Sequence, residues 1–296
     1  MKQYVFEARF YETYYFSNIV NNILRDQFSY LRKLNEFYGD DQYLEYAAPF
    51  PRRSVLHRFV EFVINDIIGE EMDEVDFDEC RAELIRYAKV PNALHELQPT
   101  ALPVNRAMNY YKIEHTSFVD WLRERGKAFD DADDDDVYEY HQDLRLEGPL
   151  DSLVERAADE VFYVIFQNRE LLSVFNGMMA RQVERSRDED VLEDYRRHFE
   201  SPGVLKRVRV PAWAKRAVFF RDRGFCSLCR SDVSGSTNVS NRANYDHVVP
   251  LACGGLNDVT NLQLLCEGCN LRKGHRSSST SNVYEAWYPT SEDFDE

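Results

Sequence analysis

The sequence predicts two regions of different fold class: a mainly helical region over residues 1–202, followed by a small α+β module over residues 203–276. Before residue 202, apolar residues recur at intervals of three and four, which is the period of an amphipathic helix. After residue 203, the chain holds two closely spaced cysteine pairs and short apolar stretches bounded by Pro and Gly. The net charge changes sign at the same place, which supports the division.

Three stretches of the N-terminal region carry the helical period most clearly. They contain Phe16, Ile19, Val20, Ile23, Leu24, Phe28, Leu31 and Leu34; then Val55, Phe59, Phe62, Val63 and Ile67; and then the apolar residues from Leu153 to Met178. Prolines fall between these stretches and predict their ends, and Asp151-Ser152 is suited to cap the last helix. The apolar run 161–166 is soon followed by polar residues, so no membrane span is predicted.

Charge is distributed unevenly along the chain. Residues 1–202 carry 24 Lys and Arg against 42 Asp and Glu, whereas residues 203–276 carry 12 against 5. A basic module attracts the phosphates of DNA, and an acidic region repels them. We therefore expect a phosphate-bearing partner to contact a basic helix face of the module, although these charges would also suit a solvated helix. The residues expected on that face are Lys206, Arg207, Arg209, Lys215, Arg216, Arg221 and Arg223.

Two connecting segments are predicted from composition. Ser201-Pro202-Gly203 is interpreted as a hinge between the regions, since Pro and Gly interrupt regular structure. Residues 277–296 are interpreted as a flexible acidic tail, which begins with the linker Ser277 to Asn282 and carries Trp287 and Tyr288. The helical region is expected to bind a protein partner, to sense a signal or to form an oligomer.

Four cysteines form two pairs of equal spacing. They are Cys226, Cys229, Cys266 and Cys269. Each Cys-x-x-Cys can form a tight turn, and two such turns complete a closed, structural shell around Zn²⁺, which would stabilise a module too small to bury a large core. Disulfides are the alternative, but no secretion signal is recognised, and Cys80 and Cys253 fit no pairing pattern. We expect those two to be reduced, partly buried thiols in a cytoplasmic protein.

Asp246, His247 and Asn270 have the side chains that hydrolysis of a phosphodiester with one divalent ion requires. Mg²⁺ is commonly held by one or two protein oxygens together with phosphate oxygens, so Asp246 and Asn270 are candidate ligands. His247 titrates near neutrality and can take a proton from an attacking water. Tyr245 and Val248-Val249 predict a strand, on which neighbours point to opposite faces. A bulge or bend is expected to bring Asp246 and His247 to one phosphate.

The residues from Tyr245 to His275 resemble the HNH nuclease motif in its zinc-knuckle form. The matching elements are Asp246-His247, Pro250, Gly254-Gly255, Asn261-Leu262, Cys266-x-x-Cys269-Asn270 and Lys273, preceded by a similar lead-in helix and knuckle from Lys215 to Cys226. The resemblance covers about residues 205–276. It implies a ββα unit with one catalytic ion, in which Asp246 and Asn270 are ligands, His247 is the general base and Asn261 orients the His247 loop.

Some roles within this resemblance stay open. Asn261 is also suited to cap a helix or turn. Lys273 and His275 could contact phosphate or end a solvated helix. The third signature residue is Asn270 and not His, a departure that is common in the family and favours Mg²⁺ or Mn²⁺ over softer metals.

These features predict a metal-dependent HNH DNA endonuclease with structural Zn²⁺ and catalytic Mg²⁺ or Mn²⁺. The resemblance suits a prokaryotic or phage-related restriction or anti-phage defence enzyme that its helical region regulates. The alternative is a non-catalytic zinc module that binds DNA in a regulatory or scaffold protein. Asp246-His247 and Asn270 favour the nuclease, since a binding module needs no base beside a hard-cation ligand. No recognition-helix motif indicates sequence-specific readout.

Overall fold

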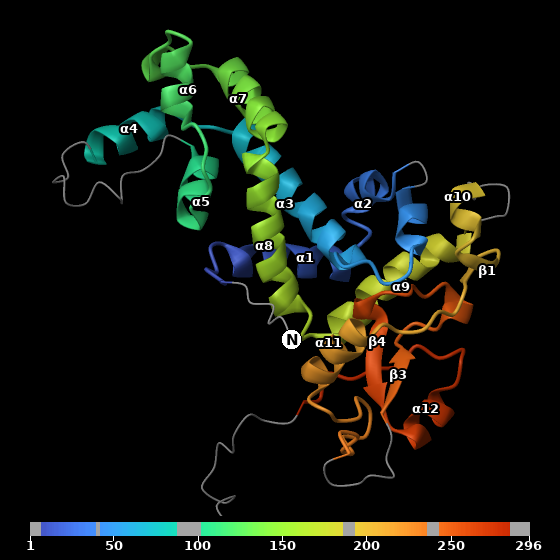
Figure 1. Ribbon diagram of the computed structural model, residues 1–296. Helices are drawn as coiled ribbons and strands as arrows, with labels where there is room; N and C mark the ends of the chain where they lie inside the picture. The colour runs from blue at the N-terminus through green and yellow to red at the C-terminus, as the bar shows by residue number, and fades with distance from the viewer. Residues whose placement is uncertain (1–6, 40–41, 88–101, 186–192, 236–242, 285–296) are drawn as a thin grey trace, which may run out of the picture. The chain divides into compact units, whose positions relative to one another are not determined.

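The computed structural model describes residues 7–39, 42–87, 102–185, 193–235 and 243–284. These residues are mostly helical, with two small antiparallel sheets near the C-terminus, so the predicted fold class is confirmed (Figure 1). The α-helices are α1 (Thr13–Arg25), α2 (Leu31–Tyr38), α3 (Val55–Asp73), α4 (Phe77–Tyr87), α5 (Pro103–Tyr111), α6 (Phe118–Glu124), α7 (Asp134–Glu147), α8 (Pro149–Ile165), α9 (Arg169–Arg185), α10 (Glu193–Arg196), α11 (Ala212–Asp222) and α12 (Glu267–Lys273). The 3-10 helices are η1 (Gln42–Ala47), η3 (Phe129–Asp131), η4 (Leu251–Cys253) and η5 (Val259–Asn261), and the strands are β1 (Phe199–Ser201), β2 (Val204–Leu205), β3 (Asn244–His247) and β4 (Leu262–Leu265). None of the described helices combines the length and apolar composition that a membrane span requires.

Contacts between residues group the chain into two compact units. The first contains Met1–Asn18 and Phe59–Phe162, and the second contains Ile19–Arg58 and Tyr163–Glu296. The second unit therefore joins the predicted C-terminal module to two segments, 19–58 and 163–202, that the sequence assigned to the helical region. The contacts divide the chain differently from the predicted boundary at residue 202, because the charge step reports on solvent-exposed side chains and not on packing.

In the first unit, Glu160 of α8 is a buried carboxylate with four donors. It is 2% exposed. It accepts hydrogen bonds from the backbone N–H groups of Arg9 and Phe10, and from the hydroxyls of Thr13 (2.6 Å) and Tyr111 (2.9 Å). These bonds fasten the residues that lead into α1, and Thr13 at its first position, to α8.

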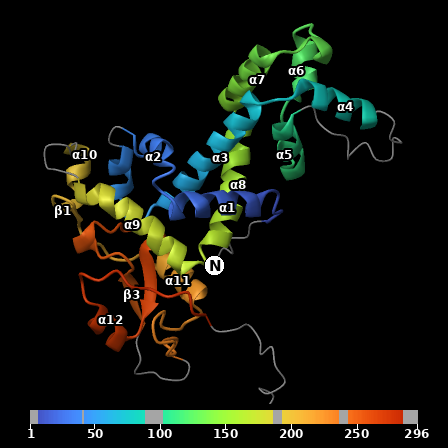
Figure 2. The ribbon, with the colours of Figure 1, turned by 180° about the vertical axis from the view of Figure 1, so that it is seen from behind.

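In the second unit, the C-terminal module packs on α9 and on residues 50–55. Figures 1 and 2 show α9 running beside α11 and the β3–β4 sheet. Three hydrogen bonds fasten the module: Phe50 N–H to Asn257 O (2.7 Å), Val55 N–H to Asp258 Oδ2 (3.0 Å) and Asn176 Nδ2 to Thr260 Oγ1 (3.3 Å). Asp258 thus caps the first turn of α3, where helical N–H groups lack partners.

The predicted hinge and the start of the basic helix both differ from expectation. Ser201 ends β1, and Pro202-Gly203 forms the turn between β1 and β2, which pair antiparallel. A side chain on Gly203, at φ +74°, would lie 3.1 Å from the Glu184 carbonyl oxygen, so this turn is packed on α9. Residues 206–211 are not helical, and α11 begins only at Ala212. Lys206, Arg207 and Arg209 therefore lie before α11, whose N-cap is Pro211.

Residues 279–284, called here the C-terminal segment, are bonded to the second unit and do not behave as the predicted flexible linker. Arg169 donates to the carbonyl oxygens of Ser281 (2.6 Å) and Val283 (2.7 Å), and its guanidinium lies 3.9 Å from the ring centroid of Tyr284. Asn282 Nδ2 donates to Asn168 Oδ1 at 2.7 Å. The predicted tail residues 285–296, with Trp287 and Tyr288, lie outside the described residues.

Asp222, at the end of α11, is fully buried between two arginines. Its Oδ1 accepts from Arg169 Nη1 (2.9 Å) and Arg221 Nε (2.8 Å), and its Oδ2 accepts from Arg221 Nη2 (3.0 Å) and Leu264 N–H (2.9 Å). Burial alone would raise the pKa of Asp222, but the guanidinium groups of Arg221 and Arg169 hold it below its ordinary value. This ion cluster therefore ties α9, α11 and β4 together.

We expect Arg169→Met to lower the free energy of unfolding of the second unit by about 3–5 kcal/mol, because it leaves a buried carboxylate with half of its compensating charge. Denaturant unfolding followed by far-ultraviolet circular dichroism measures the loss. Arg185→Met, at an exposed position of the same helix, is the matched control and should change stability by less than about 0.5 kcal/mol. Equal losses in the two variants would contradict a special role for the buried cluster.

Candidate functional site

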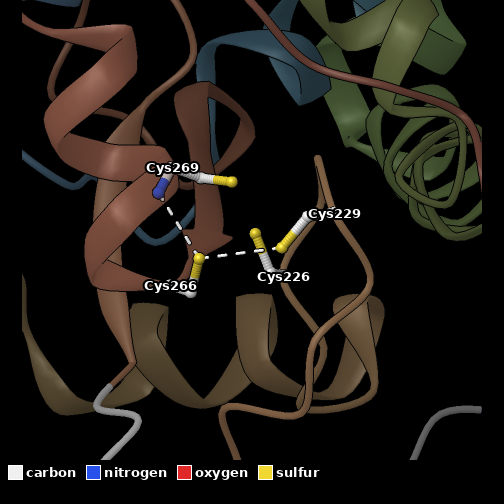
Figure 3. A group of neighbouring side chains, drawn as sticks. All are labelled: Cys226, Cys229, Cys266 and Cys269. Carbon is white, nitrogen blue, oxygen red and sulfur yellow. Dashed lines mark hydrogen bonds between the residues drawn. The ribbon is translucent and has the colours of Figure 1, made fainter.

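The four paired cysteines come together beside the β3–β4 sheet (Figure 3). Their Sγ atoms all lie within 4.8 Å of one another, and those of Cys229 and Cys266 are 3.7 Å apart. Tetrahedral zinc with Zn–S bonds of roughly 2.3 Å places its sulfurs about 3.8 Å apart, so the cluster fits one zinc ion. Cys80 and Cys253 stand apart from it as partly buried free thiols, in agreement with the prediction.

Local backbone geometry brings the cysteine pairs together. Cys226 and Cys229 lie in a turn after α11, which the Arg230 N–H closes by donating to the Cys226 carbonyl at 3.0 Å. Cys266 is the N-cap of α12, and its Sγ accepts the N–H of Cys269 at 3.4 Å. Ser227 N–H donates to the Leu264 carbonyl at 2.8 Å and so ties the first turn to β4.

Asp246, His247 and Asn270 line one open cavity of about 640 Å³ between β3, α12 and the segment after β2. β3 and β4 are antiparallel, with Asp246 opposite Gln263 and His247 opposite Leu262. His247 is the last residue of β3, and the chain bends away directly after it. The bend allows both neighbouring side chains to reach the cavity, although consecutive residues of a regular strand point to opposite faces.

Two glycines allow the loop after His247 to pack closely. A side chain at Gly254, where φ is +72°, would lie 2.4 Å from the Ala180 carbonyl oxygen of α9. At Gly255 it would lie 2.0 Å from the carbonyl oxygen of Val249. Both approaches are closer than any Cβ tolerates, so the loop requires glycine at these positions.

His247 is 3% exposed and is neutral at pH 7. Burial lowers its pKa to about 4, with a further contribution from the positive charge of Arg207. Its Nε2 is buried without a hydrogen-bond partner within the described part of the chain. An unprotonated buried nitrogen of this kind requires a donor such as a water molecule, so the imidazole is suited to accept a proton from that water.

Lys273 is buried in contact with Asp246. It is therefore neither the phosphate contact nor the solvated helix end that the sequence suggested. Its side chain is 1% exposed, and Nζ lies 2.9 Å from Asp246 Oδ2 and 2.8 Å from the His247 carbonyl oxygen. An ammonium in this position compensates the charge of Asp246 and holds the end of β3 at α12. The correction arises because α12 turns Lys273 towards the sheet, whereas its C-terminal place in the helix suggested exposure.

Asn261 makes the contacts that fasten the His247 loop. Its side chain is fully buried, accepts from Val249 N–H at 2.9 Å, and donates to the carbonyl oxygens of Val249 and Leu256, both at 2.9 Å. Its backbone carbonyl accepts from Val248 N–H at 2.7 Å. These bonds cross-link the loop to itself, so the residue does more than cap a turn.

Asp246 on β3 and Asn270 on α12 supply oxygen donors to the same cavity. Hard divalent ions accept this small donor set when phosphate oxygens and water complete the coordination shell. The residues therefore fit Mg²⁺ or Mn²⁺ better than a softer metal. Asn270 directly follows Cys269, so the cysteine cluster also holds the helix that carries it.

The candidate DNA-binding residues divide into exposed and buried groups. His275 and Arg207 are both exposed, and both line the cavity. Lys215 and Arg216 lie on α11, and Arg223 directly follows it. Arg221 cannot contact DNA in this structure, because it is 2% exposed and paired with Asp222.

Sequence reasoning missed two groups that support the site. The ion cluster of Arg169 and Asp222 joins residues 53 positions apart, and Arg169 stands in no recognisable motif. Gln263 is fully buried in a strand that otherwise contains leucine, and it contacts Asp246. A single polar residue inside an apolar strand was the available signal.

We predict one zinc ion per chain, bound through the four-cysteine cluster, since thiolates favour zinc and a closed shell stabilises the fold. Elemental analysis of the purified protein measures it. Cys226→Ser should lose zinc and unfold at lower temperature, whereas the control Cys253→Ser should keep both. Zinc-free wild-type protein of full stability would contradict this prediction.

A comparison with protein families matches residues 226–282 to the model described as HNH endonuclease. Comparisons with curated proteins and with solved structures found no match. The matched residues contain both cysteine pairs and the three side chains Asp246, His247 and Asn270 that line the cavity. Residues 226–282 of this chain therefore match the HNH endonuclease family model and hold four cysteines positioned for a zinc site.

Proposed function

We propose that this protein is a metal-dependent DNA endonuclease that hydrolyses phosphodiester bonds. The observation that carries the proposal is the single cavity in which a neutral His247 lies beside the oxygen donors of Asp246 and Asn270. The HNH endonuclease domain supports a nuclease-type function and a nucleic acid substrate.

His247 acts as the general base in this proposal. Its low pKa keeps the imidazole unprotonated at pH 7, so that it can take a proton from a water directed at the phosphorus. Asn261 is a positioning residue, because its bonds to Val249 and Leu256 hold the loop that follows the base. Lys273 holds the backbone of His247 and the carboxylate of Asp246 in place.

Asp246 and Asn270 would hold Mg²⁺ or Mn²⁺, which when bound stabilises negative charge on the phosphate and on the leaving oxygen. The small number of protein ligands suits this role, since it leaves coordination positions for the substrate. The zinc cluster has no such open position, and its part is to hold α12 and the turn after α11 together.

The basic residues that reach solvent are proposed to contact DNA phosphates. Arg207 and His275 line the cavity, and Lys215, Arg216 and Arg223 lie on or next to α11. Phosphate contacts position a protein on DNA without reading sequence, which agrees with the absence of a recognition-helix motif.

The helical residues outside the matched domain are proposed to regulate cleavage through a protein partner, a signal or self-association. Restriction or anti-phage defence in the cytoplasm is the cellular role that we propose, and it rests on the HNH resemblance. The acidic charge of residues 1–202 supports a regulatory part, since it opposes DNA binding outside the basic module.

His247→Ala should lower the rate of plasmid cleavage by roughly 10²–10⁴-fold, which is the usual contribution of a positioned general base. Supercoiled plasmid with Mg²⁺ or Mn²⁺ is the substrate, and a chelator should abolish cleavage. His198→Ala is the control, since His198 does not line the cavity.

Cleavage by His247→Ala at the wild-type rate would remove His247 from the mechanism. A wild-type protein that binds DNA but never cuts it, with either ion, would favour the alternative of a non-catalytic zinc module.

Arg207→Ala should weaken binding to a labelled duplex in EDTA, because a phosphate contact is lost. The plot of log Kd against log salt concentration should lose about one unit of slope. Arg32→Ala, on α2, is the control for removing one exposed arginine. An unchanged slope for Arg207→Ala would place this residue away from the DNA.

A further inference from the structure

Gln263 occupies a position that burial alone does not explain. It lies opposite Asp246 in the β3–β4 pairing and is fully buried in the strand Leu262–Leu265. A buried amide costs free energy unless its polar atoms are bonded, and leucine would suit this strand better. The bonds that Gln263 makes therefore indicate its role.

The amide nitrogen of Gln263 has two partners. It donates to the Ser279 carbonyl oxygen at 2.7 Å and, more weakly, to Asp246 Oδ2 at 3.4 Å. An amide NH₂ has two hydrogens, so one nitrogen can serve both acceptors. Lys273 Nζ reaches the same Asp246 Oδ2 at 2.9 Å. In the described parts of the chain, every bond to this carboxylate ends on Oδ2, which leaves Oδ1 for the cavity.

Ser279 belongs to the C-terminal segment, which is itself held in place. The Ser281 hydroxyl donates to the Ser227 carbonyl oxygen at 2.5 Å, beside the first cysteine turn. Arg169, which compensates Asp222, donates to the carbonyl oxygens of Ser281 and Val283. Hydrogen bonds thus join the buried ion cluster to the C-terminal segment at Ser281 and Val283, and a further bond joins the same segment to Gln263 at Ser279.

We propose that Gln263 is a positioning residue that couples the C-terminal segment to Asp246 and presents Oδ1 of Asp246 to a divalent ion. This inference rests on the proposed function, in which Asp246 is an ion ligand. Hydrogen-bond partners behind a ligating carboxylate fix its orientation, and their loss typically weakens metal affinity or activity by roughly 10–100-fold. Without Gln263, Lys273 alone holds Oδ2, and the carboxylate gains freedom to rotate.

Two variants and one control test this coupling in full-length, zinc-loaded protein. Gln263→Met keeps the length and approximate volume of the side chain but removes both donors. Ser281→Ala loosens the C-terminal segment without changing β4. Thr280→Val is the matched control, because the Thr280 hydroxyl is buried without a partner within the described residues and its loss removes no bond.

Mn²⁺ binding is measured without DNA by electron paramagnetic resonance, and cleavage is measured as a function of Mn²⁺ concentration. Gln263→Met should bind Mn²⁺ about 10-fold more weakly and need correspondingly more Mn²⁺ for half-maximal cleavage. Its rate at saturating Mn²⁺ and its DNA affinity in EDTA should equal those of the wild type. Ser281→Ala should also weaken Mn²⁺ binding, by a smaller factor than Gln263→Met does. Thr280→Val should bind Mn²⁺ with wild-type affinity.

Wild-type Mn²⁺ affinity in both Gln263→Met and Ser281→Ala would overturn the inference. So would a loss of zinc or thermal stability without weaker Mn²⁺ binding by the folded protein, since that result indicates a structural role only. If Gln263→Met does not fold, the Mn²⁺ affinity of Ser281→Ala tests the inference in its place. A wild-type protein that neither binds Mn²⁺ nor cuts DNA would instead overturn the proposed function, and this inference with it.

Discussion

The buried ion cluster of Asp222 with Arg169 and Arg221 is the constraint on which the C-terminal module depends. A buried carboxylate is stable only with compensating charge and hydrogen bonds, and here these come from α9, α11 and β4. The same Arg169 also holds the C-terminal segment through two carbonyl oxygens. Because one guanidinium serves both partners, the ends of the module cannot be placed independently of α9. The HNH domain is therefore built into a larger compact unit.

The sheet that carries the candidate site is too small to stand alone. Two paired strands are marginally stable in water, and β3 and β4 have four residues each. Cross-links take the place of a large core: the cysteine cluster holds α12, Asn261 holds the His247 loop, and Asp258 caps α3. The cysteine cluster ends at Cys269, directly before Asn270, and Asn261 holds the loop that follows His247. Stability and the arrangement of the proposed catalytic groups thus depend on the same contacts.

Positive charge in the module has two physical uses. Arg207 and His275 are exposed at the cavity, where they can meet phosphate. Arg221 and Lys273 are buried against Asp222 and Asp246, where each compensates a carboxylate. The net charge of the module counts the exposed Arg207 and the buried Arg221 and Lys273 alike. Part of its basic character is therefore internal, and the electrostatic attraction that the module offers to a polyanion comes from the exposed residues.

The sequence by itself determined the helical character of the N-terminal residues, the pairing of the four cysteines, and the identity of Asp246, His247, Asn261 and Asn270 as candidate groups. These features are local, since helical periods and Cys-x-x-Cys turns depend on residues a few positions apart. Only the tertiary structure decided that residues 19–58 and 163–202 join the HNH domain, that the C-terminal segment is bonded to α9, and that Arg221 and Lys273 face inward. Those outcomes depend on contacts between distant residues such as Arg169 and Asp222, which leave no periodicity or spacing in the chain.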